Sequence, residues 1–225
     1  MNLKVIKSQK INKTTFTVFF SKPKDFLFYA GQYLDYELVD INDPLGNTRA
    51  FTISASPTED YLRITTRIGK SVFKKNLIKM KIGDTISASH PAGTFTLDEK
   101  TPAVMIAGGI GITPFRSMIK YALDQKLKTP ITLIYLNPDD EFVFKEDLDK
   151  YQPNLKNLTI HYMNTTKTGH LDEHKFLKII NHKSLFLNQI FYLAGPPKMV
   201  GSFEKMLLEL EVAKDNIRYD HFDGY

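Results

Sequence analysis

The stretch MIAGGIGITPF (residues 105–115) joins an apolar run to a turn with glycines at 109 and 111. This spacing fits the first two positions of the dinucleotide-binding pattern G-x-G-x-x-G, in which backbone N–H groups and a helix N-terminus approach phosphate. The third position is Pro114. We expect Thr113 to cap the following helix and Pro114 to take its first position, where no N–H is needed. A structural strand–helix turn would use the same glycines, so both interpretations stay open at this point.

The rest of the second half has the rhythm of an α/β domain. Four compact apolar runs, PAVMIA, ITLIYL, LTIHYM and IFYLAG, are typical of buried parallel strands. Between and after them we expect helices at 114–126, 143–151, 172–180 and 197–212. Alternating strands and helices predict a parallel sheet with helices on both faces.

The first half has a different rhythm, with apolar residues at every second position. The alternating runs are TTFTVFF, GQYLDYEL, YLRITTR and DTISASH, and turn-forming residues separate them. This pattern predicts an antiparallel barrel, interrupted by one helix near 71–79 that Ser71 caps. We therefore predict two domains, an antiparallel barrel at 1–99 and an α/β domain at 100–225.

Composition excludes several kinds of site. The 225 residues include no cysteine, which rules out disulfides and a cysteine-ligated iron–sulfur cluster in this chain. The six histidines lack metal-ligand spacing, so we expect no metal. No apolar run is long enough to span a membrane, and the N-terminus lacks the apolar segment of a signal peptide. We expect a cytoplasmic protein without membrane insertion or a nucleic-acid partner.

The net charge of +5 lies entirely in residues 1–100, which hold 15 basic and 10 acidic residues. Five lysines crowd one short segment, and the helical pairs Lys70/Lys74 and Lys75/Lys79 should each share a face, with Lys81 close behind. Such a face could attract an acidic protein. The lysines could equally do no more than solvate the helix.

Taken together, four stretches resemble the ferredoxin–NADP reductase family of flavoprotein oxidoreductases. They are RAFTIS (49–54), TRIGKSVFKKNL (66–77), GGIGITP and LAGPPKM (193–199), and GQY (31–33) and HPAGTF (90–95) extend the likeness over nearly the whole chain. The resemblance implies a flavin-binding antiparallel barrel followed by a parallel-sheet NAD(P)-binding domain. It implies FAD rather than FMN, because most relatives use FAD. Proline at the third position of the glycine loop is usual in this family.

The resemblance places the flavin on the RAFTIS segment. The family motif Arg-x-Tyr-Ser/Thr matches Arg49, Phe51 and Thr52, with Ala50 between them. Arg49 would bind the pyrophosphate, Phe51 would stack on the flavin ring without the usual phenolic hydroxyl, and Thr52 would lie near the hydride-accepting atom. Strand alternation puts Arg49 and Phe51 on one face and Thr52 on the other. A helix N-terminus should hold the phosphates through Ser71 first, and otherwise through Thr66, Arg67, Gly69, Lys70 or Lys74.

The nicotinamide nucleotide would bind the second half. The resemblance gives the pyrophosphate to Gly109, Gly111, Thr113 and Pro114. It places Ala194, Gly195, Pro196 and Met199 at the nicotinamide end, with Ala194 where the family has cysteine. The stretch YLNPDDEF (135–142) offers Asn137 and Asp139 to a ribose hydroxyl and contains three acids. We therefore expect NADH to be preferred to NADPH, unless a base such as Lys167 folds over this stretch.

The C-terminus, YDHFDGY, resembles the acidic–x–aromatic ending of relatives. Asp220 and Phe222 fit that ending and, with Thr52, are the candidate catalytic residues. Tyr225 is the rival aromatic, and an ordinary final strand is the alternative.

The predicted function is hydride transfer from NAD(P)H to bound FAD, followed by electron transfer to a separate acceptor. That acceptor would be an acidic carrier such as ferredoxin or flavodoxin. The alternatives are a flavin or ferric-chelate reductase without a dedicated protein partner, and a non-catalytic redox-sensing subunit.

Overall fold

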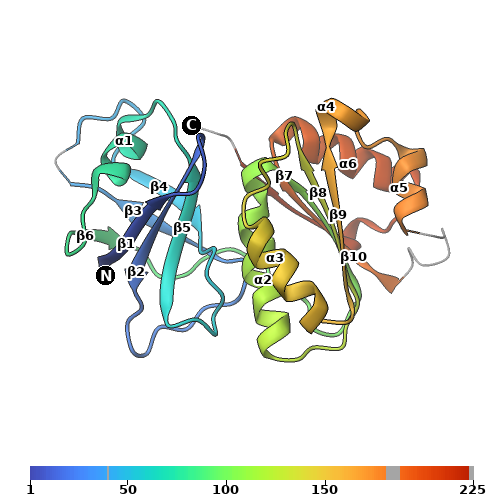
Figure 1. Ribbon diagram of the computed structural model, residues 1–225, viewed down its shortest axis with the longest axis horizontal. Coiled ribbons are helices and arrows are strands. Elements are labelled where there is room, and N and C mark those ends of the chain that lie inside the picture. The colour runs from blue at the N-terminus through green and yellow to red at the C-terminus, as the bar shows by residue number, and fades with distance from the viewer. Residues whose placement is uncertain (40, 181–187, 223–225) are drawn as a thin grey trace. The chain divides into compact units, whose positions relative to one another are not determined.

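The computed structural model describes residues 1–39, 41–180 and 188–222. These residues form two compact units, shown in Figure 1. The first unit contains residues 1–97 with 113–121, and the second contains 98–112 with 122–222. No helix among the described residues is long and apolar enough to cross a membrane.

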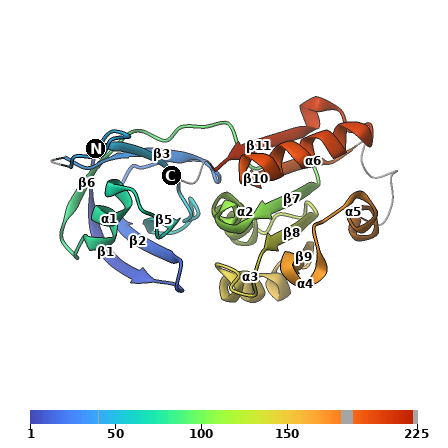
Figure 2. The ribbon, with the colours of Figure 1, turned by 90° about the horizontal axis from the view of Figure 1, so that it is seen from above.

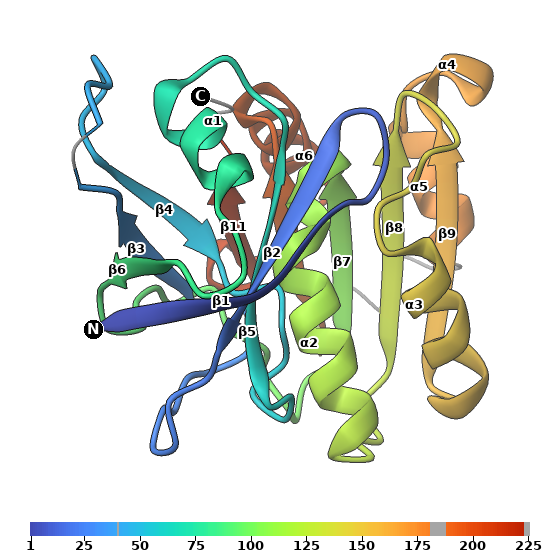
Figure 3. The same cartoon turned by 60° about the vertical axis from the view of Figure 1, so that its left-hand side comes forward.

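The first unit is built on a six-stranded antiparallel sheet, as the alternating pattern predicts (Figure 3). The strand order is β4-β3-β6-β1-β2-β5, with β1 at Asn2–Lys10, β2 at Thr15–Ser21, β3 at Tyr33–Glu37, β4 at Thr48–Thr52, β5 at Tyr61–Arg67 and β6 at Thr85–Ala88. The β2–β5 register sets Val18 opposite Ile64, and both side chains are buried in the core of this unit. Strand β1 is not predicted by the alternating pattern, because only Leu3 and Val5 are buried among its charged and polar residues.

Helix α1 (Val72–Lys79) follows β5 and begins where the sequence predicts. Ser71 caps it, and its Oγ accepts a hydrogen bond from the backbone N–H of Lys74 (3.3 Å). Phe73 and Leu77 are fully buried and attach the helix to the core.

The second unit is built on a five-stranded parallel sheet, confirming the predicted fold class. Its order is β11-β10-β7-β8-β9, with β7 at Ala103–Gly108, β8 at Ile131–Asn137, β9 at Leu158–Asn164, β10 at Ile190–Gly195 and β11 at Ile217–His221. Figure 2 shows α3 (Lys145–Tyr151) on one face and α5 (Glu173–Ile180) and α6 (Pro197–Glu209) on the other. Sequence analysis missed the short helix α4 (Thr165–Thr168).

The start of α2 (Ile112–Asp124) corrects one prediction. A 3-10 turn, Gly109–Gly111, leads straight into α2, so the helix begins before Thr113. Thr113 is therefore not the cap, and Pro114 is the third helical residue rather than the first. Proline is tolerated there because the whole first turn lacks intrahelical partners for its N–H groups.

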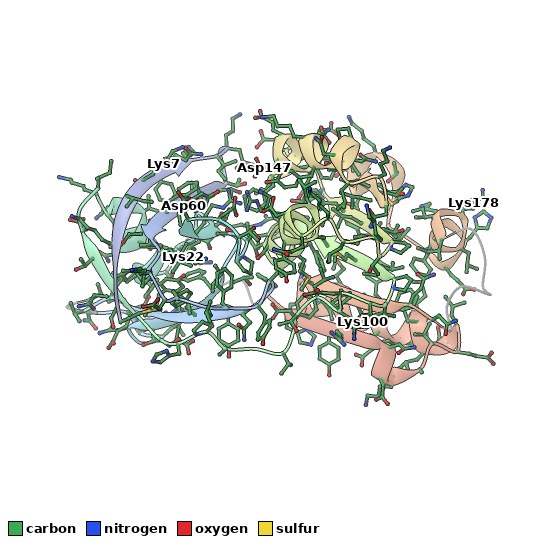
Figure 4. All side chains as sticks on the ribbon, turned by 90° about the horizontal axis from the view of Figure 1, so that it is seen from below. Lys7, Lys22, Asp60, Lys100, Asp147 and Lys178 are labelled. Atoms are coloured by element: carbon green, nitrogen blue, oxygen red, sulfur yellow. The ribbon has the colours of Figure 1, made fainter. Side chains whose placement is uncertain are left out.

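A polar network holds the segment that follows β4. The Glu59 carboxylate forms a two-point ion pair with the Arg116 guanidinium, and it also accepts hydrogen bonds from Tyr61 Oη and the Ser56 N–H. Lys22 Nζ donates to the carbonyls of Pro57 (2.6 Å) and Glu59 (3.1 Å). Figure 4 labels Lys22 together with Asp60, which adjoins this segment. Burial alone would raise the pKa of Glu59, but the hydrogen bond and charge of Arg116, together with the hydrogen bonds from Tyr61 and Ser56, lower it to about 2.

We predict that Glu59→Gln lowers the free energy of unfolding by about 3–5 kcal/mol at neutral pH, because Arg116 would remain buried without its carboxylate. The pKa of Glu59 is about 2 in the folded protein and 4.5 ordinarily. Its contribution is therefore complete above pH 4.5 and is lost as the pH falls toward 2. Urea unfolding of wild type and variant at several pH values measures this difference.

The matched control is Glu209→Gln, which removes one partner of the exposed Lys205–Glu209 pair. Exposed pairs contribute about 0–1 kcal/mol, so this variant should stay close to wild type. A Glu59→Gln protein as stable as this control would contradict the prediction.

Candidate functional site

Strand β4 presents its residues on alternate faces, as predicted. The Arg49 guanidinium lies 5.6 Å from the Phe73 ring centroid, and the Phe51 ring lies 5.9 Å from the same ring. Arg49 and Phe51 therefore share the face that meets α1. Thr52 points to the other face and is buried, and Ala50 is exposed. The pairing with β3 is unbroken, with Tyr36 opposite Arg49 and Leu34 opposite Phe51.

The Arg49 guanidinium is held by its own loop. Its Nη1 donates to the carbonyls of Leu45 (3.0 Å), Gly46 (2.8 Å) and Thr48 (2.7 Å). Its Nη2 lies 3.0 Å from Asp43 Oδ2, and both side chains are buried. A buried charge is costly unless it is paired and hydrogen-bonded, and this loop supplies both kinds of partner.

Asp43 is a functional candidate that sequence analysis missed. Its Oδ2 accepts from the N–H of Phe73 in the first turn of α1 (2.8 Å), and its Oδ1 accepts from the N–H of Leu45 (3.0 Å). These two N–H groups and then the Arg49 guanidinium lower the pKa of the Asp43 carboxyl. The only sequence signal was an aspartate in the turn NDPLGN six residues before Arg49, a pattern that a simple turn also explains.

Lys74 lies in a cluster of positive charge. Its side chain is only 6% exposed, and no carboxylate among the described residues pairs with it. Burial lowers the pKa of Lys74, and the nearby positive charges of Arg49 and Arg67 lower it further. A buried ammonium beside two guanidinium groups fits a bound anion, so the residues present suit a phosphate-bearing ligand.

The same observation corrects the prediction of a lysine surface. Lys74 is buried, so it does not share an exposed face with Lys70, whereas Lys70, Lys75, Lys79 and Lys81 are exposed. Among the other predicted residues of this region, Thr66 is buried, Arg67 is exposed, and Gly69 and Ser71 are partly exposed.

The glycine loop of the second unit depends on close backbone approach. A Cβ added to Gly111 would lie 2.2 Å from the Ala194 carbonyl oxygen and 2.7 Å from the Gly195 nitrogen. Gly109 has φ +54°, a conformation that favours glycine, and its carbonyl accepts a hydrogen bond from Tyr135 Oη (3.0 Å). The structure thus brings the turn at 109–111 against the carboxyl end of β10.

The residues after β10 pack against β7. A Cβ at Gly108 would lie 2.4 Å from Met199 Sδ and 3.1 Å from Pro196 Cδ. Ala194 is fully buried and pairs with Ala107 of β7. Pro196 precedes the first residue of α6 and Met199 lies in its first turn, so all four predicted residues of this segment lie at the carboxyl end of β10.

Polar groups after β8 and β9 meet at one edge of the sheet. Asn137 Nδ2 donates to Asp139 Oδ1 (2.6 Å), which also accepts from the Glu141 N–H (2.9 Å). Asp140 accepts from Asn164 Nδ2 (2.8 Å) and forms an ion pair with Lys167 (2.5 Å). The base that sequence analysis named as a possible exception, Lys167, therefore does fold over the acidic stretch.

The C-terminal candidates belong to the last strand. Asp220 lies in β11 opposite Ala194, and the N–H of Phe222 donates to the Gly195 carbonyl (3.0 Å). Burial raises the pKa of Asp220 to about 6, although His221 opposes the rise. An ordinary final strand is thus present through residue 221, and Tyr225 lies outside the described residues. Within the described chain no cluster of three metal-ligating side chains occurs.

Comparisons with known proteins agree with this geometry. Residues 105–205 match the model of the oxidoreductase NAD-binding domain family. Flavohemoprotein A of Dictyostelium discoideum is 25% identical over an alignment 223 residues long, which covers 91% of this chain and 56% of that protein. The chain therefore spans little more than half the length of this relative.

Two solved structures share the fold over nearly the whole chain. A ferredoxin NADP+ reductase from Neisseria gonorrhoeae with bound FAD and NADP has a TM-score of 0.83 and 17% identity, covering 100% of this chain and 98% of its own. The flavohem-like FAD/NAD binding domain of nitric oxide dioxygenase from Vibrio cholerae has a TM-score of 0.74 and 19% identity, covering 98% of both chains.

We predict that Gly111→Ala destabilises the protein by about 1–3 kcal/mol, the usual cost of overpacking a tight interior. The added methyl would collide with the backbone at Ala194 and Gly195, which cannot move as a side chain could. Gly201→Ala is the matched control, because nothing lies within 4 Å of its Cβ. Alanine in that exposed helical position should stabilise the protein by about 0.5–1 kcal/mol. Equal urea midpoints for the two variants would show that the close approach does not matter.

Proposed function

We propose that this chain is a FAD-dependent NAD(P)H oxidoreductase of the ferredoxin–NADP reductase family. Its two-unit fold and the match of residues 105–205 to the oxidoreductase NAD-binding domain support this proposal. We assign flavin binding to residues 1–99 and nucleotide binding to residues 100–225. The observation that carries the proposal is the buried cationic group of Arg49 and Lys74 beside the start of α1, together with the glycine loop after β7.

Each unit contributes groups suited to its ligand. In the first, Arg49, Lys74 and the first turn of α1 would bind the FAD pyrophosphate, and Phe51 would pack on the flavin ring. In the second, the N–H groups around Gly109 and Gly111 would approach the nucleotide pyrophosphate. When bound, FAD supplies the redox chemistry by accepting hydride from the nicotinamide and releasing electrons onward.

Three further residues have proposed roles near the reacting groups. Thr52 would donate its hydroxyl hydrogen toward the flavin, and Phe222 would cover the ring. Asp220 would hold or release a proton, which its pKa of about 6 supports because both protonation states are then populated near neutrality.

We propose a separate electron acceptor, and an acidic carrier protein is the first candidate. The exposed Lys70, Lys75, Lys79 and Lys81 support it, since complementary charge accelerates encounter. A small-molecule acceptor such as free flavin or a ferric chelate is the alternative, and a non-catalytic redox-sensing subunit is the rival outside enzymes.

The decisive experiment is anaerobic titration. The purified protein should take up FAD, turn yellow and be bleached by NADH. It should then be reoxidised by ferredoxin or flavodoxin at a rate that falls with added salt, because salt screens the lysines. Salt-independent reoxidation, equally fast with a ferric chelate, would favour the small-molecule alternative.

Arg49→Ala should weaken FAD binding by about 1.5–3 kcal/mol, the contribution of a hydrogen bond to a charged group. A colourless protein that takes up neither FAD nor FMN would refute the proposal.

We further propose that NADH is preferred to NADPH, because Asp139, Asp140 and Glu141 outweigh Lys167 and would repel a 2′-phosphate. Asp140→Asn removes one of these charges and releases Lys167. The ratio of kcat/KM for NADH over NADPH should therefore fall about fivefold, the effect of roughly 1 kcal/mol between unit charges 4 Å apart in water. Asp215→Asn, which changes an exposed acid that forms no ion pair with the described residues, should leave the ratio unchanged. A wild type that prefers NADPH would refute the assignment.

A further inference from the structure

The start of α1 is already occupied by an anionic group of the protein itself, the Asp43 carboxylate. The Asp43 carboxylate accepts the Phe73 N–H at 2.8 Å and lies 3.0 Å from Arg49 Nη2. Both partners are groups that recognise phosphate, a backbone N–H in the first turn of a helix and a guanidinium. The side chain of Asp43 is only 2% exposed, so this carboxylate is built into the fold.

The neighbouring donors are occupied by the protein in the same way. Ser71 Oγ accepts the Lys74 N–H, and the carbonyls of Leu45, Gly46 and Thr48 accept from Arg49 Nη1. A ligand phosphate that binds the N–H groups of α1 and the Arg49 guanidinium must displace the protein oxygens that now accept from them. It must also enter beside a negative charge that repels it.

We propose that Asp43 is an internal competitor for the flavin phosphate, occupying the phosphate position in the flavin-free protein and leaving it when flavin binds. This inference rests on the proposed function, since it concerns the same Arg49 and α1 site. It adds a residue that sets the affinity for flavin and assigns it a direction: the Asp43 charge weakens binding.

The local structure suits an exchange of anions. Asp43 begins a tight turn, with the Gly46 N–H bonded to its carbonyl (2.8 Å), and the residues between them are exposed, Leu45 at 65%. Residues 43–46 can therefore move away from the start of α1 without carrying an apolar core side chain into solvent. The buried Lys74 ammonium stays behind, so an incoming phosphate finds a cation that Asp43 does not pair with.

The test is Asp43→Asn in the full chain. The amide oxygen can still accept the Phe73 N–H, while the negative charge is lost. We expect FAD to bind about tenfold more tightly, the change that one charge-assisted hydrogen bond typically makes. The gain should appear as faster association with unchanged dissociation, because Asp43 contributes nothing to the bound state. Riboflavin, which has no phosphate, should bind wild type and variant equally.

Thermal unfolding gives a readout independent of binding assays. The variant should melt below wild type without flavin, and the difference should vanish at saturating FAD. Asp25→Asn, an exposed aspartate of the same unit, should change neither affinity nor melting temperature. Asp43→Ser, whose hydroxyl can also accept the Phe73 N–H, repeats the test if the asparagine variant does not fold.

The opposite result would identify Asp43 as a residue that positions Arg49. FAD binding that is unchanged or weaker in Asp43→Asn, or a faster dissociation, would overturn the inference while leaving the proposed function intact. An equal gain for riboflavin would also overturn it, because phosphate would then play no part. Failure of both wild type and variants to bind FAD would instead refute the proposed function.

Discussion

The first unit is organised by the need to neutralise a buried arginine. Arg49 is the second residue of β4 and has 5% of its surface exposed, so an unpaired guanidinium there would be strongly destabilising. The β3–β4 loop folds back so that three carbonyls and the Asp43 carboxylate meet this one group. Because Asp43 also accepts the Phe73 N–H, the same charge fixes the start of α1 against β4. Loop, strand and helix are therefore joined through a single ion pair.

The second unit depends on close backbone packing at glycines and not on a buried charge. Its glycine loop, residues 109–111, contains no cation, and Gly108, Gly111 and Gly195 let the carboxyl ends of β7 and β10 and the glycine loop approach backbone to backbone. Side chains at these positions would push the two loops apart. Polar side chains interact farther along the sheet edge, where Asn137 bonds to Asp139 and Asp140 pairs with Lys167. On the proposed function, the glycine loop would therefore recognise phosphate through N–H groups.

Local patterns predicted most of this fold, and long-range contacts explain what they missed. The alternation in β2 and β5 and the Ser71 cap are readable because the deciding residues lie within a few positions of one another. Strand β1 escaped because its pairing with β2 and β6, rather than its sparse apolar residues, makes it a strand. Asp43 escaped because its partner Phe73 is thirty residues away. The sequence predicted a surface position for Lys74, because a lysine among other lysines is normally solvated. No residue near Lys74 in the sequence indicates that its side chain is buried.

The two units thus present anion-binding groups in contrasting states. On the proposed function, the second unit would bind phosphate through N–H groups held in place by tight packing, and no acid adjoins the glycines in their described contacts. In the first, the donors are strong but already satisfied, so the net affinity is the difference between a ligand phosphate and the Asp43 carboxylate. A difference of this kind is small even when each interaction is large. On the proposed function, the residues that hold flavin most strongly are therefore also those whose existing partners limit how tightly it is held.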